Sequence, residues 1–226
     1  MGIQNIFLLS LTCVYLAIFI LSFLVCVPAG ININTFDGHC LLYASGKWNL
    51  SDSREAELTY VNWGPSSACN FTIFIGIVSI ITSLFYLARN SFLLAKGIES
   101  SWLDAFINLI VNSSMCICLF STALAVSVGF HEWCNLIKDP LSQIDRCEDG
   151  QYRTIGKHIN VDTENYYIQW QVAQFGIWTC WIGWLILSVM SLIRIYRSHR
   201  QEPFTTSMSR ERQRLLAHVG HNPVPT

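Results

Sequence analysis

Four long stretches without a charged residue constrain the fold of this chain more than any other feature. Each has between 18 and 26 residues, and they cover 6–27, 71–88, 105–130 and 172–193. A helix of about 20 apolar residues crosses the hydrocarbon core of a bilayer. Core helices of a soluble protein would carry charges on their outer faces, which these stretches lack. The sequence therefore predicts an all-α membrane protein with four transmembrane helices.

The first stretch could instead be a signal peptide that is later cleaved. Residues 1–5 carry no Lys or Arg, however, and the 22 apolar residues that follow are too many for a signal sequence. We therefore expect a retained first span within a membrane domain that covers residues 1–202. Residues 203–226 are expected to form a flexible cytosolic tail.

The charges outside the four stretches differ between the two sides of the membrane. One side carries both termini and the short connection between the second and third stretches. It holds eight Arg and Lys against four Asp and Glu, a net charge of +4. The other side holds six against eleven, a net charge of −5. Basic segments stay in the cytosol. Both termini are thus predicted to be cytosolic, in the plasma membrane or in endosomal or secretory vesicles.

The nine cysteines form two sets. Five lie inside the predicted spans, and two lie in each long loop, namely Cys40, Cys69, Cys134 and Cys147. Pairs confined to the loops fit an oxidising exoplasmic compartment. Bonds within each loop are favoured because each closes a modest loop, and bonds between the loops stay open as an alternative.

The first long loop contains two short apolar runs and one usable glycosylation sequon. Residues 40–43 and 58–63 could pair as two strands beside a Cys40–Cys69 bond. Asn49 begins an Asn-Leu-Ser sequon well away from the membrane. Asn49 is therefore the predicted glycan acceptor.

The third stretch is the most polar, because Asn108 and Asn112 stand four residues apart on one helical face. One interpretation is the lining of a narrow pathway or a small-ligand site. The other is hydrogen bonding between helices, which we favour because no predicted span contains an ionisable Lys, Arg, Asp, Glu or His.

Glycine and tryptophan mark the fourth stretch. Gly176 and Gly183 are expected to allow close helix approach. Trp170 is expected in the interfacial aromatic belt, whereas Trp178, Trp181 and Trp184 are expected to pack between helices.

No motif predicts catalysis, a cofactor, a metal site or nucleic-acid binding. Cys116 and Cys118 are one residue apart and deep in a span, where a reactive thiolate would be costly. The histidines show no spacing typical of a zinc site. We therefore expect a protein that is not an enzyme.

The tail carries one sorting motif. Glu211 stands four residues before Leu215 and Leu216, which matches the acidic dileucine pattern that clathrin adaptor complexes recognise in membrane cargo. The alternative is a short amphipathic turn on the membrane surface, aided by nearby arginines.

Several short motifs together resemble the transmembrane protein 179 family. They are GHCLLY (38–43), GKW (46–48), WGP (63–65), AC (68–69), SVGF (127–130), WC (133–134), CE (147–148), AQFG (173–176), Tyr196 and RQE (200–202). The resemblance implies a multi-pass membrane protein without catalytic residues. A looser similarity is to the four-span MARVEL architecture of synaptogyrins and synaptophysins. Trp48 and Trp63 do not reproduce the first-loop pattern of claudins.

Taken together, these features favour a non-enzymatic tetraspan protein that associates laterally with another membrane protein. It would serve as a trafficking organiser or as an auxiliary subunit. The alternative is a small channel or transporter that uses the face of Asn108 and Asn112.

Overall fold

Four long helices make up most of the fold, which is described here from a computed structural model covering residues 3–50, 56–96, 102–152 and 163–219. The helices are α1 (Ile3–Thr35), α2 (Ser66–Lys96), α3 (Trp102–Ile137) and α4 (Tyr166–Val219). Each contains a segment long and apolar enough to span a membrane: Ile6–Thr35, Ser66–Lys96, Leu103–Ile137 and Tyr166–Arg197. The four-span prediction is confirmed.

Every helix is longer than the charge-free stretch inside it. A span of 30 residues is about 45 Å long, which matches a bilayer with its headgroup regions. Polar residues are tolerated in those regions, so the backbone stays helical past the point where charges begin. A span predicted from the absence of charged residues is therefore shorter than the helix that contains it.

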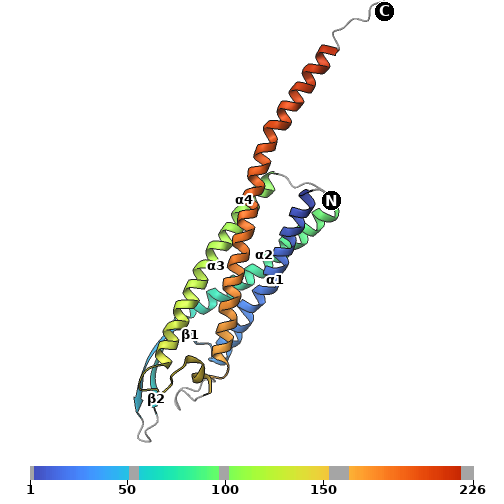
Figure 1. The fold of residues 1–226 in the computed structure, drawn as a ribbon. Helices are drawn as coiled ribbons and strands as arrows, with labels where there is room; N and C mark the ends of the chain where they lie inside the picture. The colour runs from blue at the N-terminus through green and yellow to red at the C-terminus, as the bar shows by residue number, and fades with distance from the viewer. Residues whose placement is uncertain (1–2, 51–55, 97–101, 153–162, 220–226) are drawn as a thin grey trace, which may run out of the picture.

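The helices run side by side, with both chain termini at one end of the bundle and a small sheet at the other (Figure 1). Helix α1 packs along α2 and α4, and α4 packs along α3, whereas α2 and α3 contact each other only sparsely. We call the two ends the terminus-bearing end and the head end.

Glycine allows α4 to lie close against α1, as predicted. A methyl group at Gly183 would lie 2.7 Å from Cγ1 of Ile18, and one at Gly176 would lie 3.1 Å from the carbonyl carbon of Leu24. Both distances are shorter than a comfortable carbon–carbon contact, so a larger residue would push the two helices apart.

The head end carries an antiparallel hairpin of β1 (Cys40–Leu50) and β2 (Ala56–Gly64), in which Trp48 pairs with Leu58. The two predicted strand segments lie inside these strands. Trp48 is buried, and its Nε1 donates to the carbonyl oxygen of Leu136 at 2.8 Å. This bond fixes the sheet to α3.

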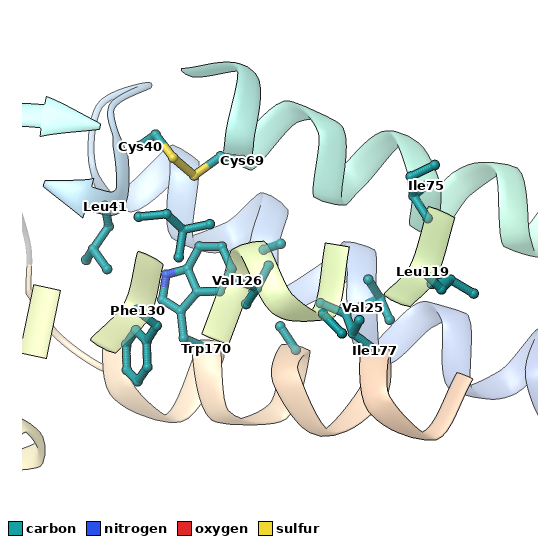
Figure 2. Close-up of a cluster of buried hydrophobic side chains, with 14 of the residues drawn as sticks. Val25, Cys40, Leu41, Cys69, Ile75, Leu119, Val126, Phe130, Trp170 and Ile177 are labelled. Atoms are coloured by element: carbon teal, nitrogen blue, oxygen red, sulfur yellow. A yellow bond between two sulfur atoms is a disulfide. The ribbon is translucent and has the colours of Figure 1, made fainter. Parts of the chain in front are cut away.

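Two disulfides fasten the head end, and they are the within-loop bonds that the sequence favours. Cys40–Cys69 joins the start of β1 to the first turn of α2 (Figure 2). Cys134–Cys147 joins α3 to the short helix η1 (Cys147–Tyr152). We call β1, β2, η1 and these two bonds the head.

An aromatic cluster joins the head to the bundle. Phe36 at the end of α1 lies with its ring centroid 5.9 Å from Trp63, 6.1 Å from Trp133 and 6.4 Å from Tyr166. Each pair meets edge to face, an arrangement that stabilises aromatic contacts. One side chain thereby contacts β2, α3 and α4 together.

Helix α4 continues to Val219 as backbone helix, beyond the bundle (Figure 1). The sequence predicts a flexible tail from residue 203, whereas the backbone is helical from there to Val219. The stretch 209–216 is rich in Arg, Gln, Glu and Leu, which are strong helix formers. Local propensity therefore favours a helical continuation.

Replacing Gly183 with alanine should destabilise the bundle, because the new methyl group must displace Ile18. We expect a loss of about 1–3 kcal/mol in the free energy of unfolding, the usual range for overpacking. Thermal unfolding in detergent measures it. Gly30→Ala is the matched control, because a methyl group there meets nothing within 4 Å. Equal effects of the two substitutions would contradict the close contact.

Candidate functional site

The predicted polar face of α3 lies inside the bundle, where Asn112 joins three helices. Tyr15 on α1 donates its hydroxyl to Oδ1 of Asn112 at 3.0 Å. Nδ2 of Asn112 donates to Oγ of Ser191 on α4 at 2.9 Å. Asn112 is fully buried and satisfied by its own chain. This arrangement is that of a packing residue.

Aromatic rings close the layer around Tyr15. Its ring stacks on Tyr86 of α2 with centroids 5.4 Å apart, and Trp184 of α4 meets its edge at 6.0 Å. All four helices therefore contribute a side chain to this layer. The bundle is filled at this depth.

Asn108 behaves differently, although it lies one turn from Asn112 on the same face. Its side chain is 6% exposed, and it forms no hydrogen bond within the described part of the chain. Buried polar atoms are nearly always paired in proteins. The two asparagines that the sequence treats alike thus have distinct environments.

Charged residues gather one to two turns beyond this layer, at the terminus-bearing end. Arg89 of α2 forms an ion pair with Oδ1 of Asp104 on α3. Arg194 of α4 lies close enough to this pair to be attracted by the carboxylate of Asp104 and repelled by Arg89. Local sequence patterns do not reveal this cluster, because each of the three charged residues directly adjoins a charge-free stretch. Their shared position next to span ends was the available signal.

A second candidate surface lies at the head end. A shallow groove of about 450 Å³ opens between α3, α4 and η1. Its polar lining includes His131, Lys138, Asp145, Arg146, Gln171 and Gln174. A groove with both cationic and acidic groups suits a polar peptide segment better than an apolar ligand.

The remaining predicted residues fall in three places. Asn49 is exposed on β1. Cys116 and Cys118 are free and half-buried within α3. The dileucine residues Leu215 and Leu216 and the acidic Glu211 lie on the backbone of α4, but their side chains are outside the described part.

Chemistry-bearing clusters are few in the part of the chain that the structure describes. No group of three or more His, Cys, Asp or Glu side chains there is placed to hold a metal ion.

Trp170, expected at the membrane interface, is fully buried, and its Nε1 donates to Oδ1 of Asn32 at 2.9 Å. The belt interpretation of Trp170 is therefore wrong. Asn32 offers a buried acceptor, so the indole is held inside the bundle.

The two asparagines of α3 provide a matched test of these contacts. Asn112→Leu should lower the free energy of unfolding by about 1–3 kcal/mol, because it leaves the hydroxyls of Tyr15 and Ser191 without their partner. Asn108→Leu removes no hydrogen bond and should leave stability unchanged or slightly raised. Thermal unfolding of both variants in detergent decides the matter. A larger loss for Asn108→Leu would show that the assignment is reversed.

The chain is similar to known membrane proteins over most of its length. Residues 7–216 match the family model described as the Transmembrane protein 179/179B Claudin domain. The chain is also 22% identical over 202 residues to Transmembrane protein 179B of Danio rerio, across 86% of this chain and 87% of that relative. No solved structure matches the chain.

The description of the matching family model also bears on the comparison with claudins. Trp48 and Trp63 depart from the claudin first-loop pattern, yet the family model that matches is a claudin domain. A single loop is a short stretch in which a few substitutions hide a relationship, whereas the model spans all four helices. Because the match runs from the first helix into the far part of α4, the chain is a multi-pass membrane protein that belongs to the transmembrane protein 179/179B family.

Proposed function

We propose that the protein is not an enzyme and acts by binding another membrane protein through its head. The observation that carries this proposal is a rigid hairpin with exposed tyrosines. The hairpin is fastened to α2 by Cys40–Cys69 and to α3 by the hydrogen bond of Trp48. A preorganised surface loses little conformational entropy when a partner binds.

Exposed aromatic side chains make this surface suitable for a protein partner. Tyr60 on β2 is 65% exposed, and Tyr152 at the end of η1 is 79% exposed. Tyrosine supplies a large contact area with few rotatable bonds, and it is enriched in protein interfaces. In addition, no further strand lies beside β2 in the described residues, so a partner segment could pair with its edge.

The contacts inside the bundle support the head, rather than the helices, as the binding surface. The amide of Asn112 is engaged with Tyr15 and Ser191, so it is not available to a neighbouring protein. The same contacts favour packing over the alternative of a channel or transporter, because a conducting pathway needs polar groups that face water.

The distribution of charge supports an orientation for this function. With the basic terminus-bearing end in the cytosol, the head and its disulfides lie in the oxidising exoplasmic space. Asn49 would then be exposed to the glycosylation machinery. We place the protein in the plasma membrane or in endosomal or secretory vesicles, as a trafficking organiser or an auxiliary subunit.

Replacing Tyr60 with asparagine should release the partner without disturbing the fold. An aromatic anchor in an interface contributes about 2 kcal/mol or more, so recovery of the partner should fall several-fold. Quantitative mass spectrometry after mild solubilisation and purification measures it. Tyr196→Asn is the matched control, because Tyr196 is 67% exposed at the opposite end.

Two outcomes of this experiment would contradict the proposal. Recovery of the wild-type chain alone in repeated purifications would remove the partner. Equal losses for Tyr60→Asn and Tyr196→Asn would show that the head is not the binding surface.

Replacing Leu215 and Leu216 with alanine should shift the protein from internal vesicles to the cell surface if adaptors read the tail. Surface biotinylation of the tagged protein measures the shift. Val219→Ala with Val224→Ala is the control, because it removes apolar side chains from the same tail but leaves the motif intact. Glycosidase treatment of the same samples, with Asn49→Gln beside them, reports the orientation. An unchanged distribution would exclude the sorting role of Glu211, Leu215 and Leu216.

A further inference from the structure

The charged cluster at the terminus-bearing end has one cation in excess. Arg89 and Asp104 neutralise each other in their ion pair. Arg194 is attracted by Asp104 and repelled by Arg89, and it forms no ion pair of its own in the described part of the chain. A guanidinium held within a membrane protein is costly unless an anion or a polar group is close to it. The cluster therefore calls for a further negative group.

Polar atoms without a partner lie in the same cluster. Oδ2 of Asp104 and Oδ1 of Asn108 are both buried and accept no hydrogen bond from the described residues. The side-chain Nδ2 of Asn108 also donates no hydrogen bond to the described residues. Such atoms in a native protein are usually satisfied by water or by a bound group. The cluster thus offers cationic donors and buried acceptors side by side.

The register of the helices brings Asn108, Arg194 and Arg89 to about one level, and Asp104 lies one turn further along α3 toward the chain termini. The bond between Asn112 and Ser191 aligns α3 with α4, which run in opposite directions. One turn closer to the chain termini, Asn108 on α3 therefore faces the level of Arg194, three residues after Ser191. Arg89 occupies the same level on α2, because it lies three residues after Tyr86, which stacks on Tyr15.

This cluster is reachable from the side of the bilayer. Helices α2 and α3 contact each other sparsely. The side chains of Arg89 and Asp104 are 29% and 16% exposed. The ammonium of Lys96 lies 4.5 Å from the centroid of the Phe92 ring, and exposed apolar side chains on the two helices include Phe85 on α2 and Phe106 and Ile107 on α3. Acyl chains pack against such residues, whereas a free anion from water gains nothing from them.

We propose that this cluster binds the headgroup of an anionic phospholipid in the leaflet at the terminus-bearing end. Arg194 and the Nδ2 group of Asn108 donate to the phosphate oxygens, and Arg89 adds positive charge. A headgroup ammonium is attracted by the carboxylate of Asp104, whose side chain is 16% exposed. Phosphatidylserine combines both features. Phosphatidylcholine lacks the net charge, and its quaternary ammonium carries no N–H donor.

The test is a lipid titration of the purified full-length protein in detergent, followed by native mass spectrometry. Phosphatidylserine, phosphatidylcholine and inorganic phosphate are added separately, and phosphate is also added in competition with phosphatidylserine. The variants are Arg194→Gln and Asn108→Leu. Arg197→Gln is the matched control, because Arg197 is an exposed arginine one turn further along α4.

We expect one saturable phosphatidylserine site in the wild type and in Arg197→Gln. Arg194→Gln should bind roughly tenfold more weakly, because it loses charged hydrogen bonds to phosphate. Asn108→Leu should also bind more weakly, while its thermal stability without added lipid stays at or above that of the wild type. This second variant keeps the test valid if Arg194→Gln fails to fold.

Four results would overturn the proposal. Equal weakening by Arg194→Gln and Arg197→Gln would indicate only general attraction to a basic surface. Equal affinity for phosphatidylcholine would exclude headgroup recognition. Unchanged phosphatidylserine binding by Asn108→Leu would remove the amide from the site. Displacement of phosphatidylserine by inorganic phosphate would identify a site for a free anion.

Discussion

Hydrocarbon offers no hydrogen bonds, so a polar side chain within the spans is stabilised by a partner on another helix or on its own backbone. The chain meets this constraint in layers along the bundle. Asn32 with Trp170, Ser79 with Trp184, and Tyr15 with Asn112 each join two helices through a buried hydrogen bond. A helix that rotated or slid would break its layer, so these bonds select one arrangement among many apolar ones.

The head depends on the same arrangement. Phe36 can contact Trp63, Trp133 and Tyr166 together only when the ends of α1, α3 and α4 meet at one level. The buried hydrogen-bonded layers fix the relative positions of these helix ends. The aromatic cluster around Phe36 then fixes the hairpin to them. Bundle and head are therefore a single cooperative structure rather than a membrane anchor with an attached loop domain.

Local patterns in the sequence were enough to predict the four spans, the two strand segments and the close approach at Gly183. Local patterns could not distinguish Asn108 from Asn112, because the difference depends on Tyr15, which is 97 residues away from Asn112. The same holds for Trp170, whose burial depends on Asn32. Arg89, Asp104 and Arg194 each directly adjoin a charge-free stretch, and their positions in the sequence do not show that they are neighbours. Only the packing of α2, α3 and α4 reveals that they meet.

The two disulfides have a consequence for biogenesis. Their cysteines are 29 and 13 residues apart, and each bond stays within one loop. Cys40 and Cys69 can be joined while the ribosome is still making the second half of the chain, and Cys134 and Cys147 can be joined before α4 is complete. Oxidation can follow the order of synthesis, so a newly made chain has no need to hold reactive thiols until distant segments arrive.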